Sequence, residues 1–217
     1  MLIRALIFDF DGTLAPQTNL LHYSSFRDAL KKFGFTLTKG QYAPYLGVPQ
    51  EQIVDVLLPH ASAEIKKKIN LYKTHYYLRL IAREKLPATN VHTLERLKER
   101  GFKIAISSGS KRAPIMKLLP EHLVEHLVTA EGTHRPKPDP EILLKAARDI
   151  RVRPEQCAYV GDSWRDCEAA RRAEMLFVGV LSDITAEELV KHGPDILINK
   201  IPELLKLFTG APQEIVL

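Results

Sequence analysis

The most restrictive feature of the sequence is its opening stretch, Leu2-Ile-Arg-Ala-Leu-Ile-Phe-Asp-Phe-Asp-Gly-Thr-Leu14, in which an apolar run ends abruptly in two carboxylates. Such a run is typical of a buried strand, and the glycine marks the point where the chain turns. In an open α/β sheet, ligands bind just beyond the carboxyl ends of the strands. Asp9 and Asp11 are therefore predicted to form the core of an active site.

Two other structures also place acidic residues beside a glycine. Asp and Gly favour turns, so the pair alone is equally compatible with a plain connection after a strand. A calcium-binding EF-hand loop needs acidic or amide side chains at its first, third and fifth positions, Gly at the sixth and Glu at the twelfth. Counted from Asp9, the fifth residue is Thr13 and the twelfth is Leu20, which excludes that loop.

The composition is that of an ordinary globular protein. The chain has 217 residues, of which 45% are hydrophobic and 26% are charged, and this length predicts a core domain that carries an insertion. Arg4 interrupts the first apolar run, so we expect no signal peptide, and no stretch reaches the ~18 apolar residues of a membrane-spanning helix. We therefore expect a cytoplasmic protein. Cys157 and Cys167 have neither metal-binding nor redox spacing.

The net charge of +5 is compatible with nucleic-acid or membrane contact, and also with an enzyme of anionic substrates. The basic residues are spread along the chain, and the only run of three is Lys66-Lys-Lys68. It lies in a predicted helix whose apolar stripe is expected to be Ile65, Ile69, Tyr72, Tyr76 and Leu80, which leaves the lysines mainly on a solvated face. We expect neither nucleic acid nor a membrane as a partner, and the sequence predicts no oligomeric state.

Residues 16–86 are predicted to be all-helical. Helices are indicated at residues 19–34, after Thr38, at residues 50–58 and at residues 62–84, with a loop at residues 42–48. Gly34 is a plausible end of the first helix. Because this block differs from the alternating pattern that follows it, we expect an inserted helical subdomain.

From residue 87 onward, helical and strand patterns alternate. A capped helix from about Thr89 to Gly101 precedes a strand at residues 102–106, and further strands are predicted at residues 127–130, 158–161, 175–181 and 196–198. This alternation predicts an α/β fold: a Rossmann-like, doubly wound parallel sheet with helices on both faces. Residues 1–15 and 87–217 are expected to form this core domain, and residues 16–86 the helical subdomain.

Polar residues gather after four of the predicted strands. They are Asp9 with Asp11, Ser107-Ser-Gly-Ser110, Arg135-Pro-Lys-Pro-Asp139 and Gly161-Asp-Ser-Trp-Arg-Asp166. Each group also has an ordinary structural explanation: a helix start for the serines, an N-cap with Pro140 at N1 for Asp139, and a capping box for Ser163 with Asp166. Together they predict a site at one end of the sheet.

Brought together, these groups fit phosphoryl transfer. Asp9 is a carboxylate nucleophile of the kind that forms aspartyl-phosphate intermediates, and such an anion needs positive charge nearby to attack a phosphate. Mg²⁺ prefers oxygen ligands, which Asp9, Asp162 and Asp166 would supply. Lys137 would add a second positive charge from an extended segment, because the following proline disfavours helical backbone. Ser108 and backbone N–H groups at a helix start suit the phosphate oxygens.

The motifs resemble those of the haloacid dehalogenase superfamily: Asp-x-Asp-Gly-Thr, a Ser or Thr at a strand end, Lys-Pro, and Gly-Asp-Ser-x-x-Asp, in order over nearly the whole chain. The resemblance implies a phosphatase of small phosphorylated metabolites, similar to the phosphoglycolate-phosphatase branch. It implies Asp9 as the nucleophile and Asp11 as the general acid and base. The implied phosphate ligands are Ser108, Gly109 and Lys137, and the implied Mg²⁺ ligands are Asp9, Asp11, Asp162 and Asp166.

The helical block resembles the cap of this family, which closes over the core and helps to choose the substrate. In the loop at residues 41–50, Tyr42, Tyr45 and Gln50 are the predicted specificity residues. Sugar-phosphate mutases of the family carry Arg where this chain has Gln50, to hold a second phosphate, and the absence of this Arg speaks against a mutase, which is the alternative activity. A second departure, Ala15-Pro-Gln-Thr18, implies a stiffer hinge into the cap. A catalytically retired binding protein is the other alternative, although no charged motif residue is missing.

One further pattern has a different chemical meaning. His122-Leu-Val-Glu-His126 matches the H-x-x-E-H pattern of certain zinc metalloproteases, which places two imidazoles one turn apart on a helix. The segment runs into a predicted strand at Leu127 and has no evident third ligand. We therefore expect no zinc site there.

Overall fold

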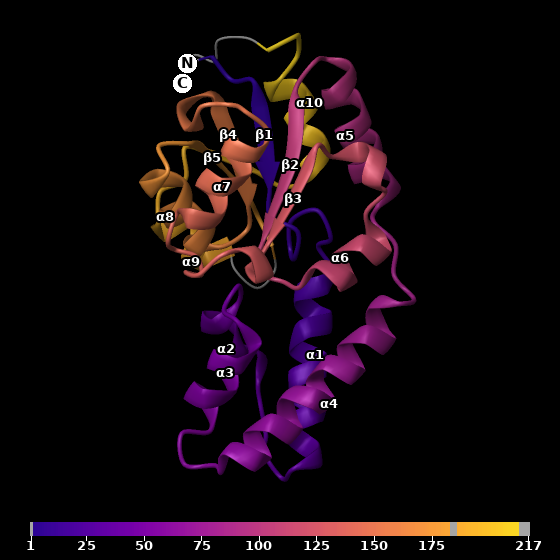
Figure 1. Ribbon diagram of the computed structural model, residues 1–217, viewed down its shortest axis with the longest axis vertical. Coiled ribbons are helices and arrows are strands. Elements are labelled where there is room, and N and C mark those ends of the chain that lie inside the picture. Colours follow the sequence, from indigo (N-terminus) through magenta and orange to yellow (C-terminus); the bar gives the residue numbers. More distant parts are fainter. Residues whose placement is uncertain (1, 183–185, 213–217) are drawn as a thin grey trace.

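The centre of the fold is a parallel sheet with the first strand of the chain in its middle (Figure 1). In the computed structural model, which describes residues 2–182 and 186–212, the strands are β1 (Ala5–Phe8), β2 (Lys103–Ser108), β3 (His126–Thr129), β4 (Cys157–Gly161), β5 (Leu176–Val180) and β6 (Ile196–Ile198). Their order is β3-β2-β1-β4-β5-β6, and all neighbours are parallel. This is the doubly wound Rossmann order, so the predicted fold class is confirmed.

The other elements are helices that lie on the sheet or beside it. The α-helices of the described residues are α1 (Thr18–Lys32), α2 (Lys39–Tyr42), α3 (Gln50–Leu57), α4 (Ala63–Ile81), α5 (Ala88–Glu99), α6 (Arg112–Leu118), α7 (Glu141–Asp149), α8 (Trp164–Arg172), α9 (Ala186–Lys191) and α10 (Leu204–Leu207). Short 3₁₀ helices are η1 (Ala43–Tyr45), η2 (Glu121–Leu123), η3 (Ala130–Gly132), η4 (Pro154–Gln156) and η5 (Ile201–Glu203).

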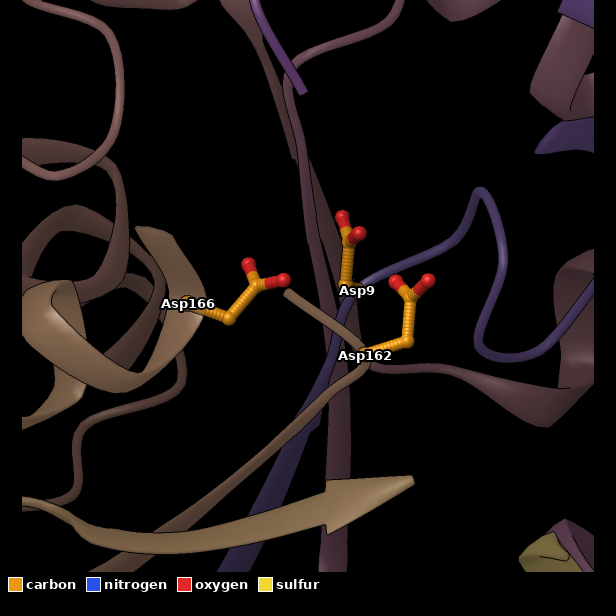
Figure 2. A group of neighbouring side chains, drawn as sticks. All are labelled: Asp9, Asp162 and Asp166. Atoms are coloured by element: carbon orange, nitrogen blue, oxygen red, sulfur yellow. The ribbon is translucent and has the colours of Figure 1, made fainter. Parts of the chain in front are cut away.

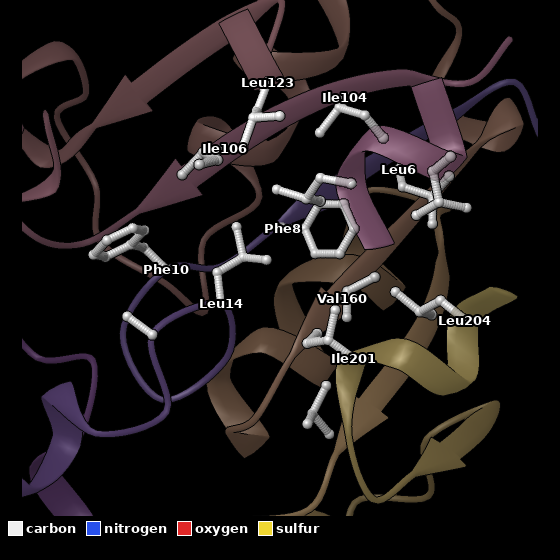
Figure 3. Close-up of a cluster of buried hydrophobic side chains, with 14 of the residues drawn as sticks. Leu6, Phe8, Phe10, Leu14, Ile104, Ile106, Leu123, Val160, Ile201 and Leu204 are labelled. Carbon is white, nitrogen blue, oxygen red and sulfur yellow. The ribbon is translucent and has the colours of Figure 1, made fainter. Parts of the chain in front are cut away.

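Side-chain alternation along β1 creates two apolar layers, one on each face of the sheet. Leu6 and Phe8 join the layer that includes α5 and α10, whereas Ala5 and Ile7 join the layer that includes α7 and α8. Figure 3 shows Phe8 at the middle of the first layer, close to Val160 of β4. The opening apolar run is thus buried on both faces, as a central parallel strand requires.

Helices α1 to α4 have a hydrophobic cluster of their own. Phe26 and Leu30 of α1 pack with Ile53 and Val54 of α3 and with Ile69 of α4. Figure 1 shows α1 and α4 side by side at the end of the molecule away from most of the sheet. This cluster is separate from both layers of the sheet. We therefore propose that residues 16–86 form a helical cap inserted into a core of residues 1–15 and 87–217.

The local signals that define these helices are mostly those expected from the sequence. Gly34 follows α1 with a φ of +82°, and Thr38 caps α2 in a capping box with Gln41. Ser62 accepts a hydrogen bond from the backbone N–H of Ile65 at the start of α4. The predicted cap of α5 is wrong, because that helix begins at Ala88, directly after a proline.

The predicted buried face of α4 is only partly right, because Tyr72 and Tyr76 are half-buried against the hydrophobic cluster of α1 to α4 whereas Ile65 is exposed. The buried residues are Ile69, Lys73, Tyr77 and Ile81, so only Ile69 of the predicted stripe is fully buried. The difference arises because this face packs on α1 and on the active site, and a lysine lies among the aromatic rings there. The run of lysines from Lys66 to Lys68 lies mainly outside this face, as predicted.

Two further predictions from the sequence concern a zinc site and membrane-spanning helices. The His122 to His126 pattern does not lie on one helix, because Glu121–Leu123 is a 3₁₀ turn and His126 begins β3. His126 Nε2 instead lies 3.0 Å from Asp149 Oδ2. Within residues 2–182 and 186–212, no helix combines the length and the apolar character that crossing a bilayer needs.

A leucine pair tests the central position of β1. Leu6→Ala is expected to lower the free energy of unfolding by about 2–5 kcal/mol, because Leu6 is completely buried and its loss leaves a cavity. Leu144→Ala on α7 is the matched control, since Leu144 is 39% exposed, and it should cost less than about 1 kcal/mol. Urea denaturation of both variants checks this, and equal losses would contradict the assignment.

Candidate active site

Three buried carboxylates meet at the carboxyl ends of β1 and β4, on either side of the point where the strand order reverses. Asp9 follows β1, Asp162 follows β4, and Asp166 lies in the first turn of α8. Each contributes an oxygen to a group in which all such atoms lie within 4.8 Å of one another. Figure 2 shows Asp166 reaching from α8 toward the other two. This is the position at which doubly wound folds bind ligands.

Two glycines allow these carboxylates to approach so closely. Gly12 has a φ of +79°, and a Cβ there would lie 2.1 Å from Asn19 Nδ2 and 2.4 Å from Asp162 Oδ2. A Cβ on Gly161 would lie 2.6 Å from the Cβ of Asp166. Any larger residue at either position would displace the acidic group.

Lys137 is the cation within the acidic group. Its Nζ lies 3.0 Å from Asp9 Oδ1 and 2.6 Å from Asp166 Oδ1, and it also donates to the hydroxyl of Tyr159 at 3.1 Å. Burial alone would lower the pKa of Lys137, but the charges of Asp166 and Asp9 outweigh it and hold that pKa well above its usual value. The predicted extended segment is instead a turn, closed by the Asp139 N–H on the Pro136 carbonyl, with a cis peptide bond before Pro138.

The group holds more negative than positive charge. Burial raises the pKa of Asp9 well above its usual value, with Asp166, Asp162 and Asp11 adding to the effect, although Lys137 opposes it. Burial and the charge of Asp166 raise the pKa of Asp162 to about 7. Burial and the repulsion between the carboxylates both disfavour their ionised forms, and a further cation would offset both effects.

Mg²⁺ fits this donor set, because every converging atom is a carboxylate oxygen. Asp166 already accepts hydrogen bonds from Lys137 and Tyr159 on Oδ1 and from the N–H and hydroxyl of Ser163 on Oδ2. Asp9 and Asp162 would hold the ion together with Asp166. Asp166 would orient Lys137 and the loop before α8.

The Asp11 side chain lies apart from this group, although the sequence predicts it as a metal ligand. Its carboxylate accepts hydrogen bonds from Ser110 Oγ at 2.5 Å and from the Tyr77 hydroxyl at 3.3 Å, and it lies 3.3 Å from His22 Nε2. Burial would raise the pKa of Asp11, but the attraction of His22 and hydrogen bonds from His22, Ser110 and Thr18 hold it below its usual range. The Asp11 carboxylate is thus not part of the group formed by Asp9, Asp162 and Asp166.

Ser108 and Gly109 lie beside Asp11 at the end of β2. The Ser108 hydroxyl lies 3.5 Å from Asp11 Oδ2 and accepts a hydrogen bond from the Ser110 N–H at 3.1 Å. A Cβ on Gly109 would lie 3.3 Å from the carbonyl oxygen of Gly47 in the cap, so the core and cap loops almost touch here. The predicted phosphate ligands Ser108, Gly109 and Lys137 line the same cavity as Asp9 and Asp11.

This cavity, of about 380 Å³, lies between the end of the sheet and the helices of the cap. Tyr42 and Gln50 line it, as predicted for specificity residues, whereas Tyr45 is not among its lining residues and packs on the cap cluster. The side-chain amide of Gln50 donates to the Asn70 carbonyl oxygen at 2.8 Å and to Thr74 Oγ1 at 3.1 Å. Gln50 is thus fixed by the cap itself.

Three polar residues of the cap at this site are absent from the sequence-based prediction. Asn19 donates to Asp162 at 2.8 Å, and Lys73 Nζ lies 2.9 Å from His22 Nδ1. Since an ammonium only donates, His22 Nδ1 accepts from Lys73 and Nε2 is left to donate to Asp11. Burial lowers the pKa of Lys73 to about 8. The spacing of four that joins Ile69, Lys73, Tyr77 and Ile81 was a signal that could have identified Lys73.

Known proteins resemble this chain in sequence and in fold. The family model of haloacid dehalogenase-like hydrolases matches residues 6–180. The chain is 29% identical to the pyrophosphatase PpaX of Bacillus pumilus, over 94% of this chain and 96% of that protein, and 27% identical to the PpaX of Anoxybacillus flavithermus, over 95% and 97%. The chain also superimposes on the β-phosphoglucomutase of Clostridium difficile with a TM-score of 0.82 and 26% identity, over 93% of each chain.

A predicted phosphoglycolate phosphatase from Haemophilus somnus has the same TM-score of 0.82, with 21% identity over 94% of this chain and 97% of that one, and shows the shared fold. The family model covers most of the chain, including β1 and the segments that carry Ser108, Lys137 and Asp162. The resemblance inferred from the motifs is therefore confirmed. The chain is a hydrolase and belongs to the haloacid dehalogenase-like hydrolase family.

Proposed function

We propose that the protein is a Mg²⁺-dependent phosphatase of small phosphorylated metabolites, with Asp9 as the nucleophile that carries the phosphoryl group. The observation that supports this most directly is the setting of Asp9, a buried carboxylate 3.0 Å from Lys137 and grouped with Asp162 and Asp166. Membership of a hydrolase family and relatives named pyrophosphatase agree with it. Mg²⁺ would supply the positive charge that lets an anionic phosphate approach this carboxylate.

In the first step, a carboxylate oxygen of Asp9 attacks phosphorus, and the bond from phosphorus to the leaving oxygen breaks. Lys137, Ser108 and the backbone N–H of Gly109 would hold the phosphate oxygens. The leaving oxygen takes a proton from Asp11. Because the pKa of Asp11 is low before substrate binds, Asp11 must first take up a proton, and His22 Nε2, 3.3 Å away, can give one only as His22 Nδ1 takes one from Lys73, 2.9 Å away.

In the second step, water attacks the phosphorus of the aspartyl phosphate. Asp11, now ionised, accepts a proton from that water, and the bond between phosphorus and Asp9 breaks to release phosphate. The hydrogen bonds from Ser110 and Tyr77 favour the ionised form that this step needs. A positioned acid and base of this kind contributes roughly 10²- to 10⁴-fold.

The charges of the cavity wall favour a substrate with a second anionic group. Lys73 and Lys111 both line the cavity, and Lys111 is close enough for its charge to oppose protonation of Lys73. Neither forms an ion pair with a carboxylate of the described residues. A diphosphate or a phosphorylated acid would supply the missing negative charge, and the first of these agrees with the relatives named pyrophosphatase.

The alternative activity, a sugar-phosphate mutase, receives less support. The mutase reading needs a guanidinium at position 50, whereas Gln50 is neutral and its amide is already bonded to Asn70 and Thr74. The structural neighbour named β-phosphoglucomutase shares the fold, but a shared fold hosts several reactions. A retired binding protein is disfavoured because every charged motif residue is present: Asp9, Asp11, Lys137 and Asp162 line one cavity, and Asp166 is grouped with Asp9 and Asp162.

Asp9→Asn tests the nucleophile. The amide keeps the shape of the side chain and removes its nucleophilic charge, so hydrolysis of pyrophosphate, 2-phosphoglycolate and p-nitrophenyl phosphate should fall to background. Asp55→Asn on the exposed surface of α3 is the control and should match the wild type. Steady-state phosphate release, with circular dichroism to verify folding, gives the result. A folded Asp9→Asn variant with wild-type turnover would rule out this role.

Removal of the metal tests the cofactor. Excess chelator should abolish phosphate release by the wild type, and added Mg²⁺ should restore it. Asp162→Asn should raise the Mg²⁺ concentration needed for half-maximal activity by about tenfold or more, because one charged oxygen ligand is lost. Magnesium titrations of both proteins provide the measurement. Undiminished activity in excess chelator would refute the dependence on Mg²⁺.

Lys73→Gln tests the second anionic group of the substrate. We expect kcat/KM for pyrophosphate and 2-phosphoglycolate, relative to that for ethyl phosphate, to fall by about tenfold, which corresponds to about 1.4 kcal/mol. The reason is the loss of a buried charge-assisted contact. Lys67→Gln, on the exposed face of the same helix, is the control and should keep the wild-type ratio. An unchanged ratio in Lys73→Gln would place the second anion elsewhere.

A further inference from the structure

The cap loop that lines the active site is tied to the core by one arginine. Arg165 Nη1 donates to the carbonyl oxygens of Pro44 at 2.8 Å and Leu46 at 3.3 Å. We propose that Arg165 is a positioning residue that holds the loop at residues 42–50 over the active site. This inference rests on the proposed function in one respect, because it assumes that the loop selects the substrate.

The two acceptors are carbonyls that the loop itself leaves unused. Within the loop, the Leu46 N–H donates to the Ala43 carbonyl and the Val48 N–H donates to the Tyr45 carbonyl. The carbonyls of Pro44 and Leu46 alternate with these and point to the guanidinium instead. A cation at the carbonyl end of a short 3₁₀ turn is electrostatically favourable. Arg165 thus completes the hydrogen bonding of the loop from the other side of the cleft.

Arg165 is held in place by stacking and lies next to a residue of the acidic group. Arg165 directly precedes Asp166 in the first turn of α8. Its guanidinium lies 4.4 Å from the centre of the Trp164 ring, and that ring stacks on His192 with centroids 5.2 Å apart. Stacking limits the conformations of the arginine before it meets the loop, so less entropy is lost on contact. One helical turn therefore positions both Asp166 and the cap loop.

Loss of this contact should affect binding more than the chemical step. The loop carries Tyr42 and Gln50 into the cavity, and its Gly47 carbonyl approaches Gly109 of the phosphate-binding segment. When the closed arrangement is less populated, apparent affinity falls in proportion, whereas saturating substrate still draws the loop into place. We therefore expect KM to rise several-fold with a smaller change in kcat.

The experiment compares Arg165→Ala, Arg165→Lys and Arg100→Ala. Arg100 is the matched control, because its Nη1 also bridges two carbonyls, those of Leu205 and Phe208, but wholly within the core. Hydrogen–deuterium exchange of the amides at residues 43–48 reports the loop without any need for activity. In Arg165→Ala it should speed up by about 5- to 10-fold, with the core unchanged. Arg165→Lys should recover part of the protection, because one nitrogen makes both bonds and an ammonium can replace it.

Kinetics with pyrophosphate and 2-phosphoglycolate form the second measurement. A rise in KM for Arg165→Ala, absent in Arg100→Ala, supports the inference. Unchanged exchange of residues 43–48, equal effects in the two alanine variants, or no recovery with lysine would each overturn it. Should the wild type hydrolyse no phosphate ester, the proposed function fails while the exchange data still decide the role of Arg165.

Discussion

The structure depends on the placement of three like charges in one buried site. Asp9, Asp162 and Asp166 come from three separate points in the chain. Among the described residues, Lys137 is the cation that forms ion pairs with this group, through Asp9 and Asp166. Burying such a set costs free energy unless each charge is paired or hydrogen-bonded. The apolar layers on the two faces of β1 have to hold this arrangement in place. The raised pKa of Asp9 and of Asp162 expresses the same imbalance, which a divalent cation would correct.

Two carboxylates separated by a single residue have opposite surroundings. Burial and neighbouring acids raise the pKa of Asp9 against the effect of Lys137, whereas His22 and Ser110 hold the pKa of Asp11 below its usual range in spite of burial. Environments that move two pKa values apart are characteristic of paired acid–base sites. Strand alternation would place residues two apart on one face, but β1 ends at Phe8 and the chain turns beyond it, so the two carboxylates enter different surroundings.

The core was largely predictable because its signals are local and repeated. The apolar run before Asp9, the glycines, and the polar residues after each strand follow directly from the geometry of a parallel sheet.

The cap residues were not predictable in the same way. Asn19, His22 and Lys73 act at the site only because α1 and α4 pack side by side against the end of the sheet, and a lysine in a helix is ordinarily solvated. Tyr45 was assigned to the cavity from its position in the loop, but a single turn of η1 directs it into the cap cluster.

The cap therefore contributes side chains to the site as well as covering it. Asn19 of α1 donates to Asp162, and Lys73 of α4 is linked through His22 to Asp11, so residues of the cap contact both the carboxylate proposed to bind the metal and the one proposed to transfer the proton. Opening of the cap would break these contacts and change the charge balance of the core. Conversely, we expect an anionic substrate between Lys73 and the core to favour closure, because Lys73 is buried and forms no direct ion pair with a carboxylate of the described residues. On the proposed function, we expect substrate binding, cap closure and the protonation of Asp11 to be coupled, with the charge of the substrate shifting all three.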